Sequence, residues 1–350
     1  MLIVAAGCRI GFDPVIDEPP VSLAALPCNR PTPIASDAMA AMPMLAAAPH
    51  ARGVALAWTD AGMVTVGGLT DDGSVRAVFA MSELIDDAHA GHVAVASAGG
   101  ATLIAGGSTS QGATSSSQLV VIDGELRPLA SATASAVRVL DARGAIATSD
   151  GWLLAGALFE TGHHTAVVAL DREGRALAAP VVLAEGKPDV VTAIALDDGW
   201  AIASQLGDRC TIAVVDRALA PVSPATTWQR CADVTGAHVA GGPEVVVAWR
   251  DAETGMLASS VLAGGALGAA SMLGIADDRP RVVASADGFW IATRADGELV
   301  VTPLDRDGRS GAPHALGPIG EGAAYDLVTI DGESYATWWT DSLTVARVCR

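Results

Sequence analysis

The chain has 350 residues, of which 51% are hydrophobic and 17% are charged. This balance excludes a disordered chain, and the length is sufficient to bury a sizeable core. The formal net charge is −18, with a single lysine at Lys187. Such a surface repels phosphates and anionic lipid headgroups, so nucleic acid is excluded as a partner.

The N-terminal residues include the run Ala5-Ala6-Gly7-Cys8. This run resembles the end of a bacterial lipoprotein signal, in which the cysteine becomes lipidated. It departs from that pattern at Ala5, where lipoproteins favour Leu, and its apolar part is shorter than the roughly 7–15 residues of a signal. The resemblance implies that residues 1–8 are the remnant of a signal whose start lies upstream, with Cys8 as the lipidation site.

The next segment, residues 9–38, is rich in proline, which favours an extended tether. Its apolar clusters indicate that part of it docks on the folded body. No apolar run in the chain approaches the roughly 20 residues of a membrane span. Contact with a membrane is therefore expected only through the lipid, and the localisation is expected to be a bacterial cell envelope or the extracellular space.

A repeat dominates residues 39–350. A glycine precedes a short, continuously apolar strand at intervals of about 46 residues, and each unit holds further short strands. This period is the signature of a β-propeller blade, whose inner strands are buried on both sides. The sequence predicts an all-β protein with one propeller of seven blades; six or eight blades and a pair of β-sandwiches are the alternatives. The seven glycines are Gly53, Gly100, Gly151, Gly199, Gly242, Gly288 and Gly332.

Turn chemistry supports this reading. The third strands of several units end in a similar turn: Thr70-Asp-Asp-Gly73, Asp171-Arg-Glu-Gly174 and Asp305-Arg-Asp-Gly308. Asp bonds its own backbone in such a turn and Gly accepts a positive φ. Trp-x-Asp recurs after second strands, where we expect Trp to pack between blades and Asp to begin the next turn. Over about residues 40–350, the chain resembles bacterial secreted propeller lipoproteins in a generic way.

The cysteines suggest how the ring closes. With Cys8 lipidated, four remain, which allow three pairings. Cys210 and Cys231 lie in one unit, so a local disulfide is expected there, and this leaves Cys28 to pair with Cys349 near the ends of the body. The last unit stops after its third strand. We expect it to borrow a strand from residues 21–36 or 42–48.

Signatures of chemistry are sparse. His89-Ala-Gly-His92 and His163-His164 lack zincin spacing, the acidic pairs lack a calcium-loop pattern, and no Gly-x-Ser-x-Gly elbow occurs. We therefore predict no catalytic, cofactor-binding or metal-binding residues. The polar residues expected on the first strands, around the central channel, are His92, Arg138, Asp141, His238, Arg281 and Asp326.

This thin set favours a monomeric, non-enzymatic binding scaffold for an unknown protein or glycan. The alternative is a propeller enzyme, a hydrolase or lyase of polysaccharide or peptide, with its site at the channel mouth. General acid–base chemistry there requires two groups with separated pKa values in one pocket.

Overall fold

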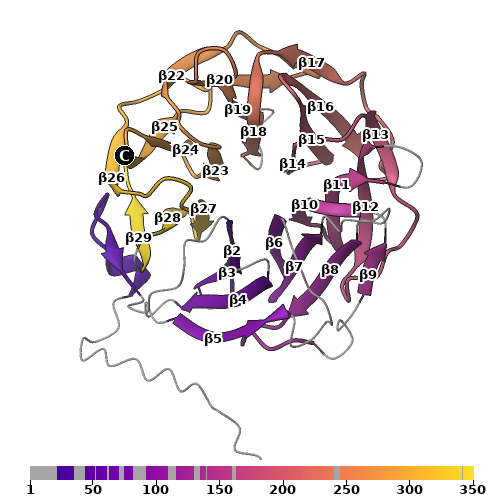
Figure 1. Cartoon of the computed structure of the whole chain (residues 1–350), viewed down its shortest axis with the longest axis horizontal. Helices are drawn as coiled ribbons and strands as arrows, with labels where there is room; N and C mark the ends of the chain where they lie inside the picture. The colour runs from indigo at the N-terminus through magenta and orange to yellow at the C-terminus, as the bar shows by residue number, and fades with distance from the viewer. Residues whose placement is uncertain are drawn as a thin grey trace, which may run out of the picture.

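The computed structural model describes residues 22–34, 44–51, 53–60, 63–70, 75–81, 92–108, 116–129, 135–138, 140–159, 163–239, 245–340 and 342–350. These residues form seven antiparallel sheets arranged around a centre, which is a seven-bladed β-propeller (Figure 1). The predicted fold class and blade number are confirmed. Residue Cys8 and the predicted signal remnant lie outside the described residues.

Each blade is a meander whose first strand lies nearest the centre of the ring (Figure 1). Blade 1 contains β2 (Leu45–His50), β3 (Gly53–Asp60), β4 (Met63–Thr70) and β5 (Val75–Ala80). Blade 2 contains β6 (His92–Ala98), β7 (Ala101–Ser108), β8 (Ser116–Ile122) and β9 (Ser135–Arg138). Blade 3 contains β10 (Leu140–Ala147), β11 (Gly151–Leu158), β12 (His164–Asp171) and β13 (Val181–Glu185). Blade 4 contains β14 (Val190–Leu196), β15 (Gly199–Leu206), β16 (Arg209–Asp216) and β17 (Thr226–Gln229).

The remaining blades complete the ring. Blade 5 contains β18 (Cys231–His238), β19 (Val245–Asp251), β20 (Met256–Ala263), β21 (Ala266–Leu267) and β22 (Ser271–Ile275), the last two both pairing with β20. Blade 6 contains β23 (Arg281–Ser285), β24 (Gly288–Ala295), β25 (Glu298–Leu304) and β26 (His314–Pro318). Blade 7 contains β27 (Tyr325–Ile330), β28 (Glu333–Trp339), β29 (Leu343–Val348) and β1 (Thr32–Pro33).

The hydrophobic core is divided among the seams between blades. Seven clusters of buried side chains occur, one at each contact between neighbouring blades around the ring. Strand β11 is buried at every position, as expected for a strand covered on both faces. Trp58 and Trp339 stack at 6.3 Å between blades 1 and 7, so the tryptophans of two Trp-x-Asp repeats fill a seam.

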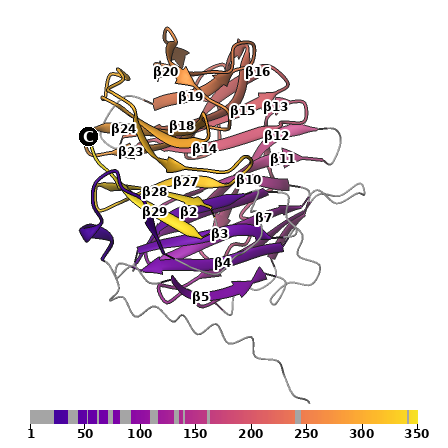
Figure 2. The ribbon, with the colours of Figure 1, turned by 60° about the vertical axis from the view of Figure 1, so that its left-hand side comes forward.

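The ring closes with a strand from the N-terminal side. β1 pairs with β29 as the outermost strand of blade 7, and the indigo segment lies beside yellow β29 in Figure 2. The strand donor is therefore in residues 21–36. The other candidate segment, residues 42–48, contributes instead to β2, the first strand of blade 1. Among the described residues, no helix is long and apolar enough to cross a membrane.

Several contacts hold this closing segment in place. A disulfide joins Cys28 to Cys349, the pairing expected for the two ends of the body. The Asn29 side chain donates to the Cys349 carbonyl at 2.9 Å and accepts from its backbone N–H at 3.0 Å. Leu23, in the 3-10 helix η1 (Leu23–Ala25), and Leu26 are buried in the seam between blades 7 and 1. The second disulfide joins Cys210 to Cys231, which confirms the expected pairing. The expectation that both cysteines lie in one unit is wrong, because Cys210 is on β16 of blade 4 and Cys231 begins β18 of blade 5.

Candidate functional site

Several charged side chains gather at one end of the central channel. The first strands of all blades begin there, and we call this end the channel mouth. Within the described first strands, three aspartates lie near the strand start, and each of these three is paired with an arginine. Asp141 lies 2.8 Å from Arg143, Asp233 lies 2.9 Å from Arg250, and Asp326 lies 3.5 Å from Arg281.

These carboxylates are further tied to the protein backbone or to buried surroundings. Asp326 accepts from the backbone N–H of Ala47 at 2.8 Å and of Leu327 at 2.9 Å, which links blade 7 to blade 1. Burial raises the pKa of Asp326, while Arg281 opposes the shift. The Asp141 side chain is fully buried and that of Arg143 nearly so. Removing one partner of such a buried ion pair destabilises the fold, because the other charge stays buried without compensation.

Arg279 crosses the mouth from the segment before blade 6. Its Nη2 donates to Thr192 Oγ1 of blade 4 at 3.1 Å, and the Tyr325 hydroxyl donates to its carbonyl. Burial, with Arg281 next, lowers the pKa of Arg279 to about 9, and burial raises the pKa of Tyr325 to about 12. At neutral pH, Arg279 remains charged and Tyr325 remains a neutral hydrogen-bond donor.

His92, at the start of β6, also lies at this mouth. Burial, and secondly the positive charge of Arg143, lowers its pKa to about 4. The imidazole is therefore neutral at neutral pH. Each of the three carboxylates binds a guanidinium. The Arg281–Asp326 pair and the Arg279–Thr192 hydrogen bond also join different blades, so the described groups at the mouth form a structural network.

The sequence placed some of these residues correctly and others wrongly. His92, Asp141, Arg281 and Asp326 meet at the mouth as expected. Arg138 belongs to β9, the outermost strand of blade 2, so its predicted place on a first strand is wrong.

His238 was also predicted beside these channel residues, but it ends β18 at the opposite end of the channel. There its Nε2 lies 3.4 Å from Asp197 Oδ1. The described residues contain no group of three or more His, Cys, Asp or Glu side chains that could hold a metal.

Arg279, Arg143 and Arg250 are mouth residues that sequence reasoning missed. Arg279 precedes its strand, Arg143 lies among apolar neighbours on β10, and Arg250 lies on a second strand. The partner of Arg279 comes from the ring geometry, because Thr192 is 87 residues away in the sequence. A polar side chain in an otherwise apolar strand was the available signal, and it applied only to Arg143 and Arg250.

The opposite face carries the turns between first and second strands, and we call it the hairpin face. Pockets open on this face between the described parts of neighbouring blades. Groove 3/4, of about 300 Å³, is lined by Ser149, Asp150, Leu177, Leu196, Trp200 and Arg217 among others. Groove 4/5, of about 510 Å³, is lined by Asp197, Asp198, Val215, Val222, His238 and Leu262 among others. Groove 6/7, of about 190 Å³, is lined by Asp287, Trp290, Glu333, Arg347, Cys349 and Arg350 among others.

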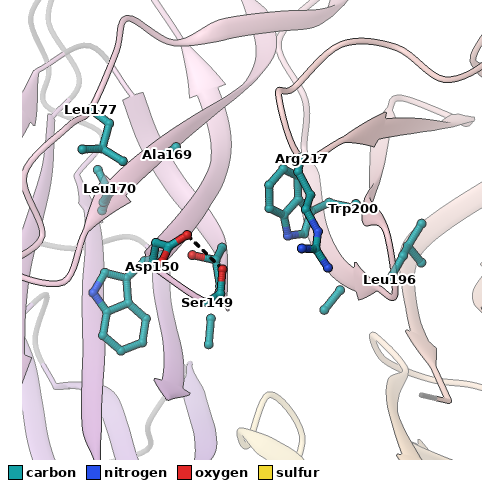
Figure 3. A pocket seen from close by; sticks show the side chains of 13 residues that line it. Ser149, Asp150, Ala169, Leu170, Leu177, Leu196, Trp200 and Arg217 are labelled. Atoms are coloured by element: carbon teal, nitrogen blue, oxygen red, sulfur yellow. Dashed lines mark hydrogen bonds between the residues drawn. The ribbon is translucent and has the colours of Figure 1, made fainter. Parts of the chain in front are cut away.

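Groove 3/4 has two chemically different walls. Figure 3 shows Ser149 and Asp150 on one side and Trp200 with Arg217 on the other. Ser149 Oγ donates to Asp150 Oδ2 at 3.0 Å, and Arg217 donates to the Asp197 carbonyl at 2.9 Å. This groove therefore offers a carboxylate and a guanidinium on facing walls.

Comparisons with solved structures agree on the fold. Kuenenia stuttgartiensis hydrazine synthase matches with a TM-score of 0.61 and 13% identity, over 87% of this chain and 95% of that one. The β-propeller domain of Myceliophteria thermophila Cps50 (Swd1) matches with a TM-score of 0.56 and 14% identity, over 90% and 98%. The WD40 domain of Toxoplasma gondii coronin matches with a TM-score of 0.55 and 12% identity, over 93% and 88%.

At these identities, the likeness defines the class of fold, a β-propeller, and nothing finer. No protein-family profile matches the sequence, and no curated protein sequence matches it.

Proposed function

We propose that this chain is a non-enzymatic binding propeller at a bacterial cell envelope, anchored by a lipid on Cys8, and that its hairpin face receives a protein or glycan partner. The observation that carries the proposal is the set of three grooves that open on one face between blades. Concave sites with a few polar groups among apolar side chains are the usual form of a ligand site.

Two further features support it. The two disulfides favour an oxidising compartment outside the cytosol. At the channel mouth, the carboxylates of Asp141, Asp233 and Asp326 are engaged by arginines. Carboxylates paired in this way stabilise the ring, and they are less suited to transferring protons than unpaired carboxylates are.

The partner is tested by presenting the purified chain to a glycan array and to cross-linking in envelope extracts. We expect saturable binding to one protein or glycan that leaves the partner chemically unchanged. Mass spectrometry of the bound partner checks this. Hydrolysis or elimination products that disappear in a His92→Gln variant would instead support the alternative, an enzyme at the channel mouth, where His92 lies beside Asp141 and Arg143.

The anchor is tested separately by labelling expressing bacteria with an alkyne fatty acid. We expect label on the wild-type chain and none on a Cys8→Ala variant, which should leave the membrane fraction. Label that persists in the variant would place the lipid elsewhere, and an unlabelled wild-type chain would remove the anchor.

A further inference from the structure

Groove 6/7 already contains a guanidinium, that of Arg350. Its Nη2 donates to the carbonyl of Asp287 at 2.9 Å and to the carbonyl of Leu304 at 2.8 Å. Its Cζ lies 5.9 Å from the centre of the Trp290 ring. Asp287 belongs to the turn between first and second strands of blade 6, and Leu304 ends the third strand. The protein therefore shows how this kind of groove holds an arginine side chain.

The same pair of carbonyls recurs in blade 4. A Cβ built on Gly288 would lie 2.2 Å from the Leu304 oxygen, and one built on Gly199 would lie 2.1 Å from the Val215 oxygen. The third strand thus meets the turn in the same way in both blades. Asp198 and Val215 of groove 4/5 correspond to Asp287 and Leu304 of groove 6/7.

A second repeated contact fixes this correspondence. Arg217 Nη2 donates to the Asp197 carbonyl at 2.9 Å, and Arg306 Nη2 donates to the Ala286 carbonyl at 2.9 Å. Asp197 and Ala286 are the residues before Asp198 and Asp287. The two turns are therefore held in the same way.

Groove 4/5 differs from groove 6/7 in the charged side chains that line it. Its lining includes the carboxylate residues Asp197 and Asp198, and Val222 at its rim is 63% exposed. No lysine or arginine is among the described residues that line it, whereas Arg217 lines groove 3/4 and Arg347 and Arg350 line groove 6/7. Apolar walls of Val222 and Leu262 suit an aliphatic stem, and the carboxylates suit a cationic head.

We propose that groove 4/5 binds an arginine side chain presented by a partner protein, an inference that rests on the proposed binding function and names its site. The guanidinium donates to the carbonyls of Asp198 and Val215 and lies near the carboxylates of Asp197 and Asp198. The methylenes of the arginine pack on Val222 and Leu262. The net charge of −18 attracts a basic segment from a distance.

The experiment uses labelled peptides in which one arginine is flanked by glycines, with fluorescence anisotropy at low salt as the measurement. Matched peptides carry lysine or citrulline, which keeps the shape of arginine without its charge. We expect the arginine peptide to bind at least about tenfold more tightly than the citrulline peptide, a difference of about 1.4 kcal/mol, with lysine between them.

Two variants locate the site. The double variant Asp197→Asn/Asp198→Asn should weaken arginine binding about tenfold, while the matched change Asp150→Asn in groove 3/4 should alter it less than about twofold. Val222→Arg, at an exposed position, should fill the groove and abolish binding. Thermal melting checks that each variant is folded. If the double variant does not fold, Val222→Arg alone tests whether the arginine peptide binds in groove 4/5.

The inference is overturned if the wild-type chain does not bind the arginine peptide, if citrulline binds equally well, or if the groove 4/5 variants bind as the wild type does. These results leave the proposed function standing when an envelope protein or glycan still binds the variants. Absence of any envelope partner for the wild-type chain would contradict the proposed function itself.

Discussion

Single glycines set how closely the strands of a blade approach. Gly199 begins β15, and a Cβ there would meet the Val215 oxygen at 2.1 Å. Gly151 has the same contact with the Leu170 oxygen, at 2.1 Å. The sequence predicted these glycines as tight-turn residues. The structure gives a different physical reason, because the backbone of the third strand occupies the space that a side chain needs.

Substitution of Gly199 by alanine should therefore destabilise the fold. The carbonyl in contact belongs to backbone, which cannot rotate away as a side chain does, so we expect a loss of about 2 kcal/mol or more. Gly320→Ala is the control, since its nearest neighbour would be Ala323 Cβ at 3.9 Å. Urea midpoints measure both variants, and equal midpoints would refute the close-contact argument.

The buried ion pair of Asp141 and Arg143 should contribute strongly to the free energy of unfolding. Arg143→Met leaves the Asp141 carboxylate buried without its guanidinium partner. We expect a loss of about 3–5 kcal/mol in the free energy of unfolding. The double variant Arg143→Met/Asp141→Asn should recover part of this loss, because the uncompensated charge is gone. A double-mutant cycle measures the coupling, and additive losses would contradict it.

The lowered pKa of His92 predicts that the stability of the fold depends on pH. Its pKa is lowered from 6.5 to about 4 in the folded chain. Between these values, the unfolded state binds a proton that the folded state does not, so stability falls as the pH is lowered from 6.5 towards 4. The loss for one such group is roughly 3 kcal/mol. Unfolding free energies of wild type and His92→Gln across this range test it, and parallel curves would exclude His92 as the cause.

At the scale of elements, one turn recurs after the third strands of blades 2, 3, 4 and 6. An aspartate side chain accepts from backbone N–H groups within the turn, and the residue three positions later has a positive φ. The sequence also predicted this turn at Thr70–Gly73, where residues 71–73 lie outside the described ones. Of the four copies above, it identified those at Asp171 and Asp305, because glycine occupies the positive-φ position. It missed the other two because Leu126 and Leu219 occupy that position.

Those two leucines explain the limit of sequence reasoning here. Leu126 has a φ of 63° and Leu219 a φ of 64°, and both are buried in inter-blade clusters. Packing between blades compensates a backbone conformation that local sequence preferences reject. The regular spacing and apolar second strands were sufficient to predict the fold. The grooves and the Arg281–Asp326 pair were not predictable, because they join residues from different blades.

The two disulfides should contribute unequally to stability. Cys28–Cys349 closes a separation of 321 residues, and Cys210–Cys231 closes one of 21 residues. The chain-entropy relation gives about 6 kcal/mol for the first and about 3 kcal/mol for the second. Replacing each pair with serines and comparing urea unfolding measures this order. A larger loss for the Cys210–Cys231 pair would contradict it.

At the scale of the molecule, the ring has seven seams and each blade is stabilised by two neighbours. The seam between blades 7 and 1 is unlike the others because the N-terminal segment completes it. Leu23 and Leu26 add to its buried cluster, and Ile34 N–H donates to the Leu343 carbonyl at 2.8 Å. The segment predicted as a tether therefore supplies a structural part of the ring in residues 22–34.

A chain that starts at residue 35 tests this role. It loses β1, the Cys28–Cys349 disulfide and two buried leucines, and it leaves the edge of β29 unpaired. Leu26→Ala alone should cost about 2–5 kcal/mol, so the truncation should cost more. An unpaired edge strand also promotes association between chains.

The measurements are thermal melting and light scattering. We expect a lower melting temperature for the truncated chain and a mass that rises with concentration, while Leu26→Ala melts earlier but stays monomeric because β1 still covers β29. A truncated chain that melts as the full chain does would show that the seam between blades 7 and 1 holds without its N-terminal segment. The ring would then be closed by packing alone.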